Sequence, residues 1–195
     1  MKLIINQSTN QESLIRGCKK KHRQAQRDVY NWLAPKMLGL CRRYIKDVNE
    51  AESVMITGFM KVLDKIEQFS GEGSFEGWVR RIMVNESLLY IRKNKGMYIE
   101  VDIEYANTEP HYELASENLE ADDLLNLING LPIGYRTVFN MFAIEGYSHK
   151  EIAKSLAISE NTSKSQLSRA RKMLQKQIID KEAMWDEKLR RNEKA

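Results

Sequence analysis

Hydrophobic residues recur at the spacing of an α-helix along most of the chain, most clearly between residues 51 and 69. There the apolar positions follow one another at steps of three or four residues, as on one face of a helix: Ala51, Met55, Phe59, Val62, Ile66 and Phe69. Val and Ile do not alternate with polar residues over long stretches, as they do in half-buried strands. The pattern therefore predicts an all-α protein.

Several helix boundaries in the first half of the chain are indicated by capping residues and by proline. Thr9 and Glu12 have the spacing of a capping box, which predicts the start of a first helix. Pro35 is expected to kink the second helix or to mark a restart. Asn49 and Glu52 are expected to cap the third.

A Ser- and Gly-rich break at residues 70–73 separates the third predicted helix from the fourth. Ser74 is expected to cap the fourth helix. The inner stripe of this helix is predicted to hold Phe75, Trp78, Val79, Ile82 and Leu89, and its other side is basic. A glycine-flanked loop beside a basic helix that carries aromatic residues can hold an unstacked nucleic-acid base. Aromatic residues at helical spacing are more often core, so we expect both rings in the core and the loop backbone free for function.

The helical periodicity disappears in the middle of the chain. Residues 97–117 are rich in acidic side chains and read as a flexible linker. We therefore expect a helical domain at residues 8–96, an acidic linker at 97–117, a second helical domain at 118–177 and a charged tail at 178–195. The tail can either extend the last helix or fray.

Two short helices joined by a turn are predicted near the C-terminus. Ser148 and Glu151 form a capping box, and Ser159 is a second N-cap after a turn of three residues. This arrangement is a helix-turn-helix. The second helix is expected to expose polar and basic residues that reach phosphates and base edges, namely Asn161, Thr162, Ser163, Lys164, Ser165, Gln166, Arg169 and Arg171. A surface helix of an ordinary bundle would also have a polar face, so the motif favours DNA binding without identifying the class of protein.

The net charge of +4 hides three blocks of different sign. Residues 1–99 carry 18 basic and 10 acidic side chains, residues 100–123 carry 9 acidic and no basic ones, and residues 124–195 carry 13 basic and 8 acidic ones. Two basic regions joined by an acidic segment indicate two separate contacts with nucleic acid.

Catalysis, metal binding and membrane insertion find no support in the sequence. No nucleophile–base series, pair of buried carboxylates or phosphate-binding glycine loop occurs, so neither an enzyme nor a cofactor is expected. Cys18 and His22 have helical spacing, but a structural zinc site needs four ligands and the remaining His and Cys residues are far apart in sequence. No apolar run is long enough to span a bilayer and no signal-peptide core is present. We therefore expect a cytosolic protein.

The chain resembles the extracytoplasmic-function (ECF) group of bacterial RNA polymerase sigma factors in three segments. The stretch AQRDVYNWLAPKMLGLCRRYIKDVNEAESVMITGFMKVLDKIEQF is similar to the first conserved helices of the family. GSFEGWVRRIMVNESLLYIRKNK is similar to its promoter-melting and minus-ten segment, and LPIGYRTVFNMFAIEGYSHKEIAKSLAISENTSKSQLSRARKML to its minus-thirty-five module. The resemblance covers roughly residues 12 to 176, and the order of the segments makes it specific.

The resemblance implies a partner for each segment. One face of the third helix would dock on the clamp helices of the largest polymerase subunit through Glu52, Ser53, Ile56, Thr57 and Met60. The loop and the fourth helix would bind the minus-ten element and a flipped base through Ser70, Gly71, Gly73, Ser74, Arg80, Arg81 and Asn85. The helix-turn-helix would read the minus-thirty-five element and lie near the polymerase flap. An anti-sigma factor and a linker that threads toward the RNA exit path are also implied.

Some residues differ from the usual family pattern. Ser53, Ile56 and Thr57 stand where the family often has Asp, Gln and Glu, and Ala157 stands where the turn usually has Gly. Two alternatives from other classes remain open. A helix-turn-helix transcription regulator would explain residues 120–176 equally well, and a helical adaptor that binds only protein would explain the amphipathic helices.

Overall fold

The computed structural model describes residues 2–95 and 121–192, and the predicted linker at 97–117 lies outside them. Every regular element in these two ranges is helical, as the apolar spacing predicts. The chain divides into two compact units, Met1–Gly96 and Met97–Ala195. The domain limits 8–96, 97–117, 118–177 and 178–195 stay predictions.

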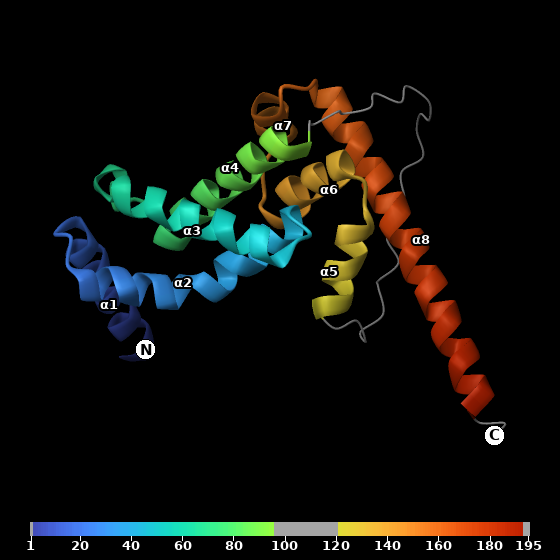
Figure 1. Cartoon of the computed structure of the whole chain (residues 1–195), viewed down its shortest axis with the longest axis horizontal. Coiled ribbons are helices and arrows are strands. Elements are labelled where there is room, and N and C mark those ends of the chain that lie inside the picture. Colours follow the sequence, from blue (N-terminus) through green and yellow to red (C-terminus); the bar gives the residue numbers. More distant parts are fainter. Residues whose placement is uncertain (1, 96–120, 193–195) are drawn as a thin grey trace. The chain divides into compact units, whose positions relative to one another are not determined.

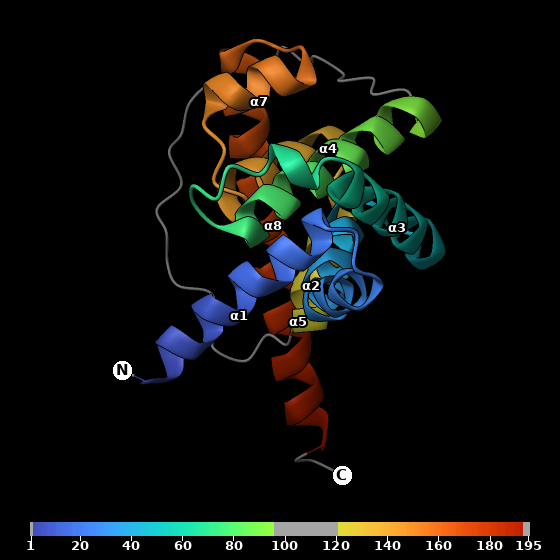
Figure 2. The ribbon, with the colours of Figure 1, turned by 90° about the vertical axis from the view of Figure 1, so that its left-hand side faces the viewer.

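The N-terminal unit is built from four α-helices and a short 3₁₀ turn. These are α1 (Lys2–Lys19), α2 (Arg23–Tyr44), α3 (Val48–Asp64), the 3₁₀ turn Ile66–Gln68 and α4 (Phe75–Lys95). Helices α2, α3 and α4 pack against one another, and α1 packs against α2 (Figure 1, Figure 2). The core between them is fully buried and mostly aliphatic, and it includes Leu33, Met37, Leu40, Val62, Val79, Met83 and Ile91. Gly58 lets α3 approach α4, because a β-carbon there would collide with the Met83 side chain.

Two predicted starts of helices are wrong, and both helices begin earlier. Helix α1 already runs from Lys2, so Thr9 lies inside it. A Thr and a Glu three residues apart also share one face of a continuing helix. Helix α3 is capped by Asp47, whose carboxylate accepts a hydrogen bond from the Glu50 amide at 2.9 Å. The Asp47 carboxylate thus pairs a first-turn amide that has no partner within the helix, and it lies near the positive end of the helix dipole. Because Asp47 is the N-cap, Asn49 lies within α3.

Pro35 lies inside α2 and does not end it. Pro35 and Asn31, whose carbonyl it cannot bond, are both exposed, so water can hydrate that carbonyl. Leu89 was predicted in the inner stripe of α4 but is 48% exposed. The buried stripe passes through Leu88 and Ile91 instead, and one residue along a helix turns a side chain by about 100°.

The C-terminal unit is organised along its longest helix, α8 (Glu160–Asn192). The elements before it are α5 (Ala121–Gly130), α6 (Ile133–Phe139), a π-helical turn at Asn140–Ile144 and α7 (His149–Leu156). Helices α5, α6 and α7 each pack against α8, drawn in orange to red in Figure 1. The buried core of this unit comprises Leu131, Val138, Met141, Ile152, Leu156, Leu167 and Ala170. Of the two alternatives for the tail, the structure has the extended helix as far as Asn192.

Candidate nucleic-acid interface

The helix-turn-helix is confirmed in its local geometry. The Ser148 hydroxyl accepts a hydrogen bond from the Glu151 amide at 3.3 Å, and the Glu151 carboxylate accepts one from the Ser148 amide at 2.8 Å. This reciprocal pair is the predicted capping box of α7. Ser159 begins α8, and its hydroxyl accepts a hydrogen bond from the Thr162 amide at 2.9 Å. Both caps are therefore made by the residues that the sequence indicates.

The turn between α7 and α8 contains an alanine in a left-handed conformation. Ala157 has φ of 57° and ψ of 43°, and its amide donates to the Ala153 carbonyl at the end of α7. A β-carbon disfavours this region, which is why glycine is the common residue at such a position. The turn thus keeps the geometry that usually calls for glycine, with a side chain that strains it.

The exposed part of the second helix is smaller than the sequence indicates. Asn161, Lys164 and Ser165 are exposed at the N-terminal end of α8. Thr162 is half-buried, and its hydroxyl lies 2.8 Å from the Ser159 hydroxyl. The Ser165 hydroxyl donates to the Thr162 carbonyl at 3.0 Å, so Asn161 and Lys164 are the exposed side chains of this group that can meet DNA without rearrangement.

The expected exposure of Ser163 and Gln166 is wrong, because both side chains are buried, with 0% and 3% of their surface accessible. Ser163 lies 2.9 Å from the ring nitrogen Nδ1 of His149 on α7. Gln166 packs against Gly134 on α6. They lie on the same side of α8 as Leu167 and Ala170, at helical spacing, so position on the helix outweighs polarity here.

Two arginines in the first half of α8, Arg169 and Arg171, are held against the C-terminal unit. Arg169 donates to the Tyr135 hydroxyl at 3.3 Å, and the Arg171 guanidinium lies 5.8 Å from the centre of the Phe142 ring. The His149 ring also stacks on Phe142, with the two ring centres 4.5 Å apart. Burial, together with the nearby positive charges of Lys164 and Arg171, lowers the pKa of His149 below its usual range. Both arginines are thus half-buried and oriented by aromatic residues.

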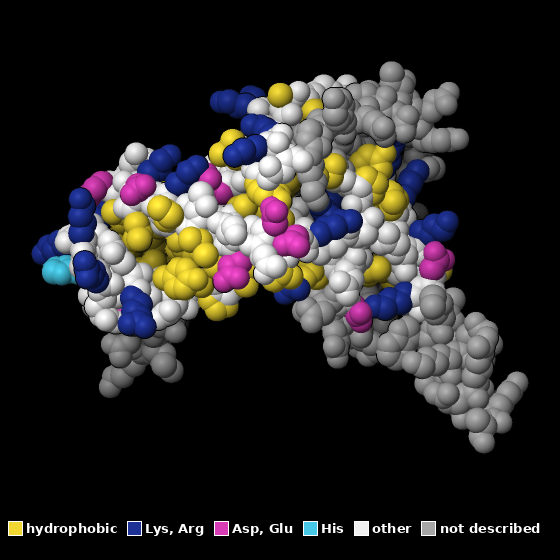
Figure 3. All heavy atoms as spheres, viewed as in Figure 1, with side chains coloured by type: hydrophobic (Ala, Val, Ile, Leu, Met, Phe, Trp, Pro, Cys, Tyr) yellow, Lys and Arg dark blue, Asp and Glu magenta, His cyan; other side chains and the backbone are white. Residues whose placement is uncertain are grey.

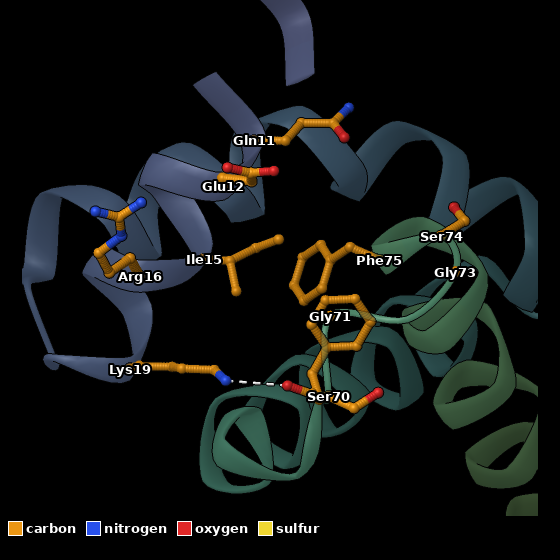
Figure 4. Close-up of a pocket in the computed structure, with 11 residues that line it drawn as sticks. Gln11, Glu12, Ile15, Arg16, Lys19, Ser70, Gly71, Gly73, Ser74 and Phe75 are labelled. Atoms are coloured by element: carbon orange, nitrogen blue, oxygen red, sulfur yellow. Dashed lines mark hydrogen bonds between the residues drawn. The ribbon is translucent and has the colours of Figure 1, made fainter. Parts of the chain in front are cut away.

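The loop predicted to hold a base borders a cavity of about 440 Å³ in the N-terminal unit (Figure 4). The loop contributes Ser70, Gly71, Gly73 and Ser74 to the lining. Gly71 and Gly73 have φ of +89° and +77°, so only glycine adopts this backbone without strain. The Ser74 hydroxyl accepts a hydrogen bond from the Gly77 amide at 3.2 Å, which is the predicted cap of α4. The loop is therefore shaped by its glycines and held at the start of α4.

Aromatic rings support the floor of this cavity. Phe69 and Phe75 are buried and line it, with ring centres 5.2 Å apart in an edge-to-face arrangement. Trp78 is half-buried behind them, with its ring 5.6 Å from Phe69 and 5.8 Å from Phe75. The expectation of a core position is thus confirmed for Phe75 and holds in part for Trp78. Rings fixed in this way give a rigid surface for a planar ligand.

Five residues of α1 complete the cavity, and no sequence pattern indicates that they do. These residues are Gln11, Glu12, Ile15, Arg16 and Lys19. Lys19 donates a hydrogen bond to the Phe69 carbonyl at 3.0 Å and thereby joins α1 to the loop, 50 residues further along the chain. A contact of such separation leaves no periodic or local pattern. The cavity is therefore a product of tertiary packing.

The outer face of α4 continues from the loop as a basic stripe. Arg81 and Asn85 are exposed one turn apart, and Arg80 is half-buried beside them. Leu89 follows at the same spacing and is also exposed, so it adds an apolar side chain to this stripe. On another face, Glu86 forms a salt bridge with Lys61 of α3 at 2.7 Å. The stripe offers charge, an amide and an apolar group to a ligand.

The face of α3 expected to dock on the polymerase is exposed and combines polar with apolar side chains. All five predicted residues, Glu52, Ser53, Ile56, Thr57 and Met60, are exposed. The Ser53 and Thr57 hydroxyls each donate at 2.9 Å to the backbone carbonyl four residues earlier, so these polar groups are already bonded within the helix. Figure 3 shows hydrophobic side chains gathered at the surface over α2 and α3. Ile56 and Met60, 45% and 63% exposed, are the largest apolar groups that α3 offers here.

The described residues give no sign of a metal site or of a membrane span. Among the side chains that the structure describes, no three His, Cys, Asp or Glu residues are grouped so that they could hold a metal ion. Of the described helices, none combines the length and the hydropathy that a membrane crossing requires. Cys18 and Cys41 are buried free thiols, and burial raises the pKa of Cys41 to about 11.

Comparison with known families matches both units. Residues 29–96 match the model of sigma-70 region 2, and residues 121–174 match that of sigma-70 region 4. The chain is 31% identical over 179 residues to the ECF RNA polymerase sigma factor SigW of Bacillus subtilis, which covers 85% of this chain and 95% of that protein. It is 29% identical over 156 residues to the ECF RNA polymerase sigma-E factor of Haemophilus influenzae, covering 73% of this chain and 82% of the relative.

Solved structures with the same fold include two complexes. One is the sigma factor RpoE with the anti-sigma factor NepR from Bartonella quintana, with a TM-score of 0.52, 20% identity, and coverage of 79% of this chain and 96% of that one. The other is CnrH with the cytosolic domain of CnrY, with a TM-score of 0.50, 17% identity, and coverage of 86% and 96%. At these identities the likeness concerns the fold.

Proposed function

The chain belongs to the ECF group of RNA polymerase sigma factors, so it binds core RNA polymerase, recognises promoter DNA and promotes strand opening, and we propose that three of its surfaces divide this work. The observation that carries the proposal is the order of the matches, with region 2 in the N-terminal unit and region 4 over the helix-turn-helix. A regulator of another class would need only the second of these. The three surfaces are the exposed face of α3, the loop-bordered cavity with α4, and the start of α8.

The face of α3 docks on the clamp helices of the largest polymerase subunit. Its exposed apolar residues support this assignment, because Ile56 and Met60 gain free energy when a partner removes them from water. The ring of Tyr30 on α2 lies 4.9 Å from that of Phe59 and is itself partly exposed, which extends the apolar surface beyond α3. Glu52 supplies the charged group in this set of residues.

The cavity beside the loop holds a base of the minus-ten element that is turned out of the DNA stack. Bases extruded from a duplex are bound by stacking on aromatic rings and by hydrogen bonds to their edges. Phe69 and Phe75 supply the rings, and Ser70 and Ser74 supply hydroxyls at the loop. Arg80, Arg81 and Asn85 are then in position for the neighbouring sugar and phosphate groups. Capture of the unpaired base favours the open strand.

The start of α8 reads the minus-thirty-five element as duplex DNA. Asn161 can pair with a base edge in the major groove, and Lys164 can reach a phosphate, whereas Ser165 would first have to release the Thr162 carbonyl. Arg169 and Arg171, oriented by Tyr135 and Phe142, flank this group. We assign Ser163 and Gln166 to the support of the helix and not to the reading of DNA, because both are buried.

Control and location follow from the family. We propose that an anti-sigma factor binds this chain, as NepR binds RpoE in the similar structure. The protein would act in the cytoplasm, where the polymerase is, and would carry no catalytic activity of its own. The flap region of the polymerase would meet the C-terminal unit, and the acidic linker would lead toward the RNA exit path.

Binding of promoter DNA with and without core polymerase tests the proposal. The expected result is strong binding of duplex promoter DNA by the chain and core together, with weak binding by either alone. A helix-turn-helix regulator would bind the duplex by itself and would not co-purify with core polymerase. Strong binding by the chain alone, unchanged by core enzyme, would contradict the proposal.

A further inference from the structure

The cavity in the N-terminal unit carries a carboxylate where a site for DNA would be expected to be basic. Among the described residues that line it, Glu12 is the one acidic side chain. Figure 4 shows its carboxylate beside Ile15 on the α1 wall, with the Phe75 ring across the space. A negative charge repels the phosphates of DNA, so a carboxylate at this place weakens binding unless a donor group of the ligand meets it.

Glu12 is exposed, and no residue that the structure describes neutralises its carboxylate. Arg16 is one turn further along α1 and also lines the cavity, but no ion pair joins it to Glu12 in the described part of the chain. Lys19, the other cation of the lining, is bonded to the Phe69 carbonyl. Within the described part of the chain, the Glu12 carboxylate makes no hydrogen bond or ion pair. A ligand that donates to this carboxylate would therefore displace water and not a protein group.

The hydrogen-bonding edges of the four bases differ in what they offer a carboxylate. An ionised carboxylate only accepts hydrogen bonds. Cytosine and adenine present an exocyclic amino group, and guanine presents a ring N–H next to an amino group. Thymine presents a single N–H between two carbonyl oxygens, and those oxygens repel the carboxylate. A carboxylate at the cavity wall thus separates amino-bearing bases from thymine.

We propose that Glu12 is a specificity-determining residue, which selects a flipped base with an amino group on its edge and rejects thymine. The inference rests on the proposed function of the cavity and adds to it the class of base that the cavity takes. The base stacks on the phenylalanine rings and turns its edge to α1, where Glu12 accepts a hydrogen bond from the amino group. The neighbouring Gln11, which both donates and accepts, can complete the pairing with any amino-bearing base.

The test is the binding of holoenzyme, made from this chain and core polymerase, to promoter forks. Each non-template position of the minus-ten element is varied through all four bases. The wild-type chain is expected to disfavour thymine at one position by about tenfold, the factor of one charge-assisted hydrogen bond. Glu12→Gln is expected to reduce this factor to about twofold, because the amide can donate to a thymine carbonyl. Glu67→Gln removes the same charge from an exposed residue outside the cavity lining and is expected to change no preference.

A second variant separates the failure of this inference from the failure of the proposed base site. Ser70→Trp introduces an indole at an exposed position of the lining and is expected to abolish the preference at that one position. If Ser70→Trp abolishes the preference while Glu12→Gln keeps the full discrimination against thymine, the cavity holds the base and the role of Glu12 is overturned. If Ser70→Trp leaves every base preference unchanged, the base is not held in this cavity, and both proposals are overturned.

Discussion

At the scale of single residues, Ala157 shows how one β-carbon strains the turn that orients α8. Its left-handed backbone costs about 1–2 kcal/mol relative to glycine. A glycine at this position would avoid that strain, but it would lose about 0.5–1 kcal/mol of stability because its unfolded chain has greater conformational entropy. The difference still favours glycine, and the strain lies at the joint between the two helices of the motif.

We predict that Ala157→Gly raises the free energy of unfolding of the C-terminal unit by about 0.5–1 kcal/mol, the net of these opposing effects. The measurement is denaturant unfolding of the full chain, followed by circular dichroism and analysed for each transition. Gly146 also has a positive φ, of 76°, and serves as the matched control, since Gly146→Ala should destabilise the same unit. A loss of stability in Ala157→Gly would show that the turn is not strained as described.

Asn161 and Lys164 are exposed neighbours at the start of α8, and the two should differ in their effect on promoter binding. Asn161→Ala should cost about 1–3 kcal/mol and relax the preference at one position of the upstream element, as expected for a base contact. Lys164→Ala should weaken binding to all sequences and lower the salt slope by about one, as expected for a phosphate contact. The measurement is promoter binding by holoenzyme over a salt series, with Lys176→Ala, an exposed lysine further along α8, as the control. Equal effects of all three substitutions would contradict these assignments.

At the scale of elements, the proposed docking face of α3 offers apolar side chains because two of its three polar side chains, Ser53 and Thr57, are bonded within the helix. The Ser53 and Thr57 hydroxyls donate to backbone carbonyls of α3 itself, which leaves Ile56 and Met60 as the side chains that a partner can bury. Burial of apolar surface is not screened by salt, in contrast to pairing of exposed charges. The contact with the polymerase should therefore depend less on ionic strength than one built on carboxylates.

Ile56→Asp should weaken the binding of core polymerase by roughly 10- to 100-fold, the factor that corresponds to about 1.5–3 kcal/mol for a buried isoleucine. The measurement is capture of core polymerase by the immobilised chain at several salt concentrations, with circular dichroism to verify that helix content is unchanged. Ile179→Asp places the same change at a residue that is 56% exposed on α8 and should leave capture intact. Unchanged capture by Ile56→Asp at every salt concentration would show that docking uses another surface.

The elements that could be predicted from the sequence are those fixed by local chemistry. The capping box at Ser148, the cap at Ser159 and the glycines of the loop act over three or four residues, and each lies where the pattern indicates. The burial of Ser163 and Gln166 is predictable from their helical spacing to Leu167 and Ala170, because the face of the helix on which a residue lies outweighs its polarity here.

The cavity could not be predicted, because it depends on contacts that are remote in sequence. Its α1 wall meets the loop through the hydrogen bond from Lys19 to the Phe69 carbonyl. The composition of neither segment indicates that contact. Glu12 has the spacing of a capping box with Thr9 but lies within α1 and lines this cavity. Residues that determine specificity are thus the hardest to find when they come from an element outside the motif.

At the scale of the whole molecule, two compact units carry the two surfaces that we propose contact promoter DNA. The N-terminal unit has the docking face and the base cavity, and the C-terminal unit has the helix-turn-helix. This division explains why the two basic blocks of the sequence are separated by an acidic one. It also implies that a promoter for this protein contains two sequence elements, each of which depends on residues of one unit.

Run-off transcription with core polymerase on a genomic promoter library tests this central claim most directly. The account predicts transcripts from promoters that share an upstream and a downstream element at a constant spacing. Lys164→Ala should weaken all of them, Asn161→Ala should relax the upstream element alone, and Ser70→Trp should relax the downstream element alone. Absence of transcripts above those of core polymerase alone, or a downstream preference that changes with Asn161→Ala, would contradict it.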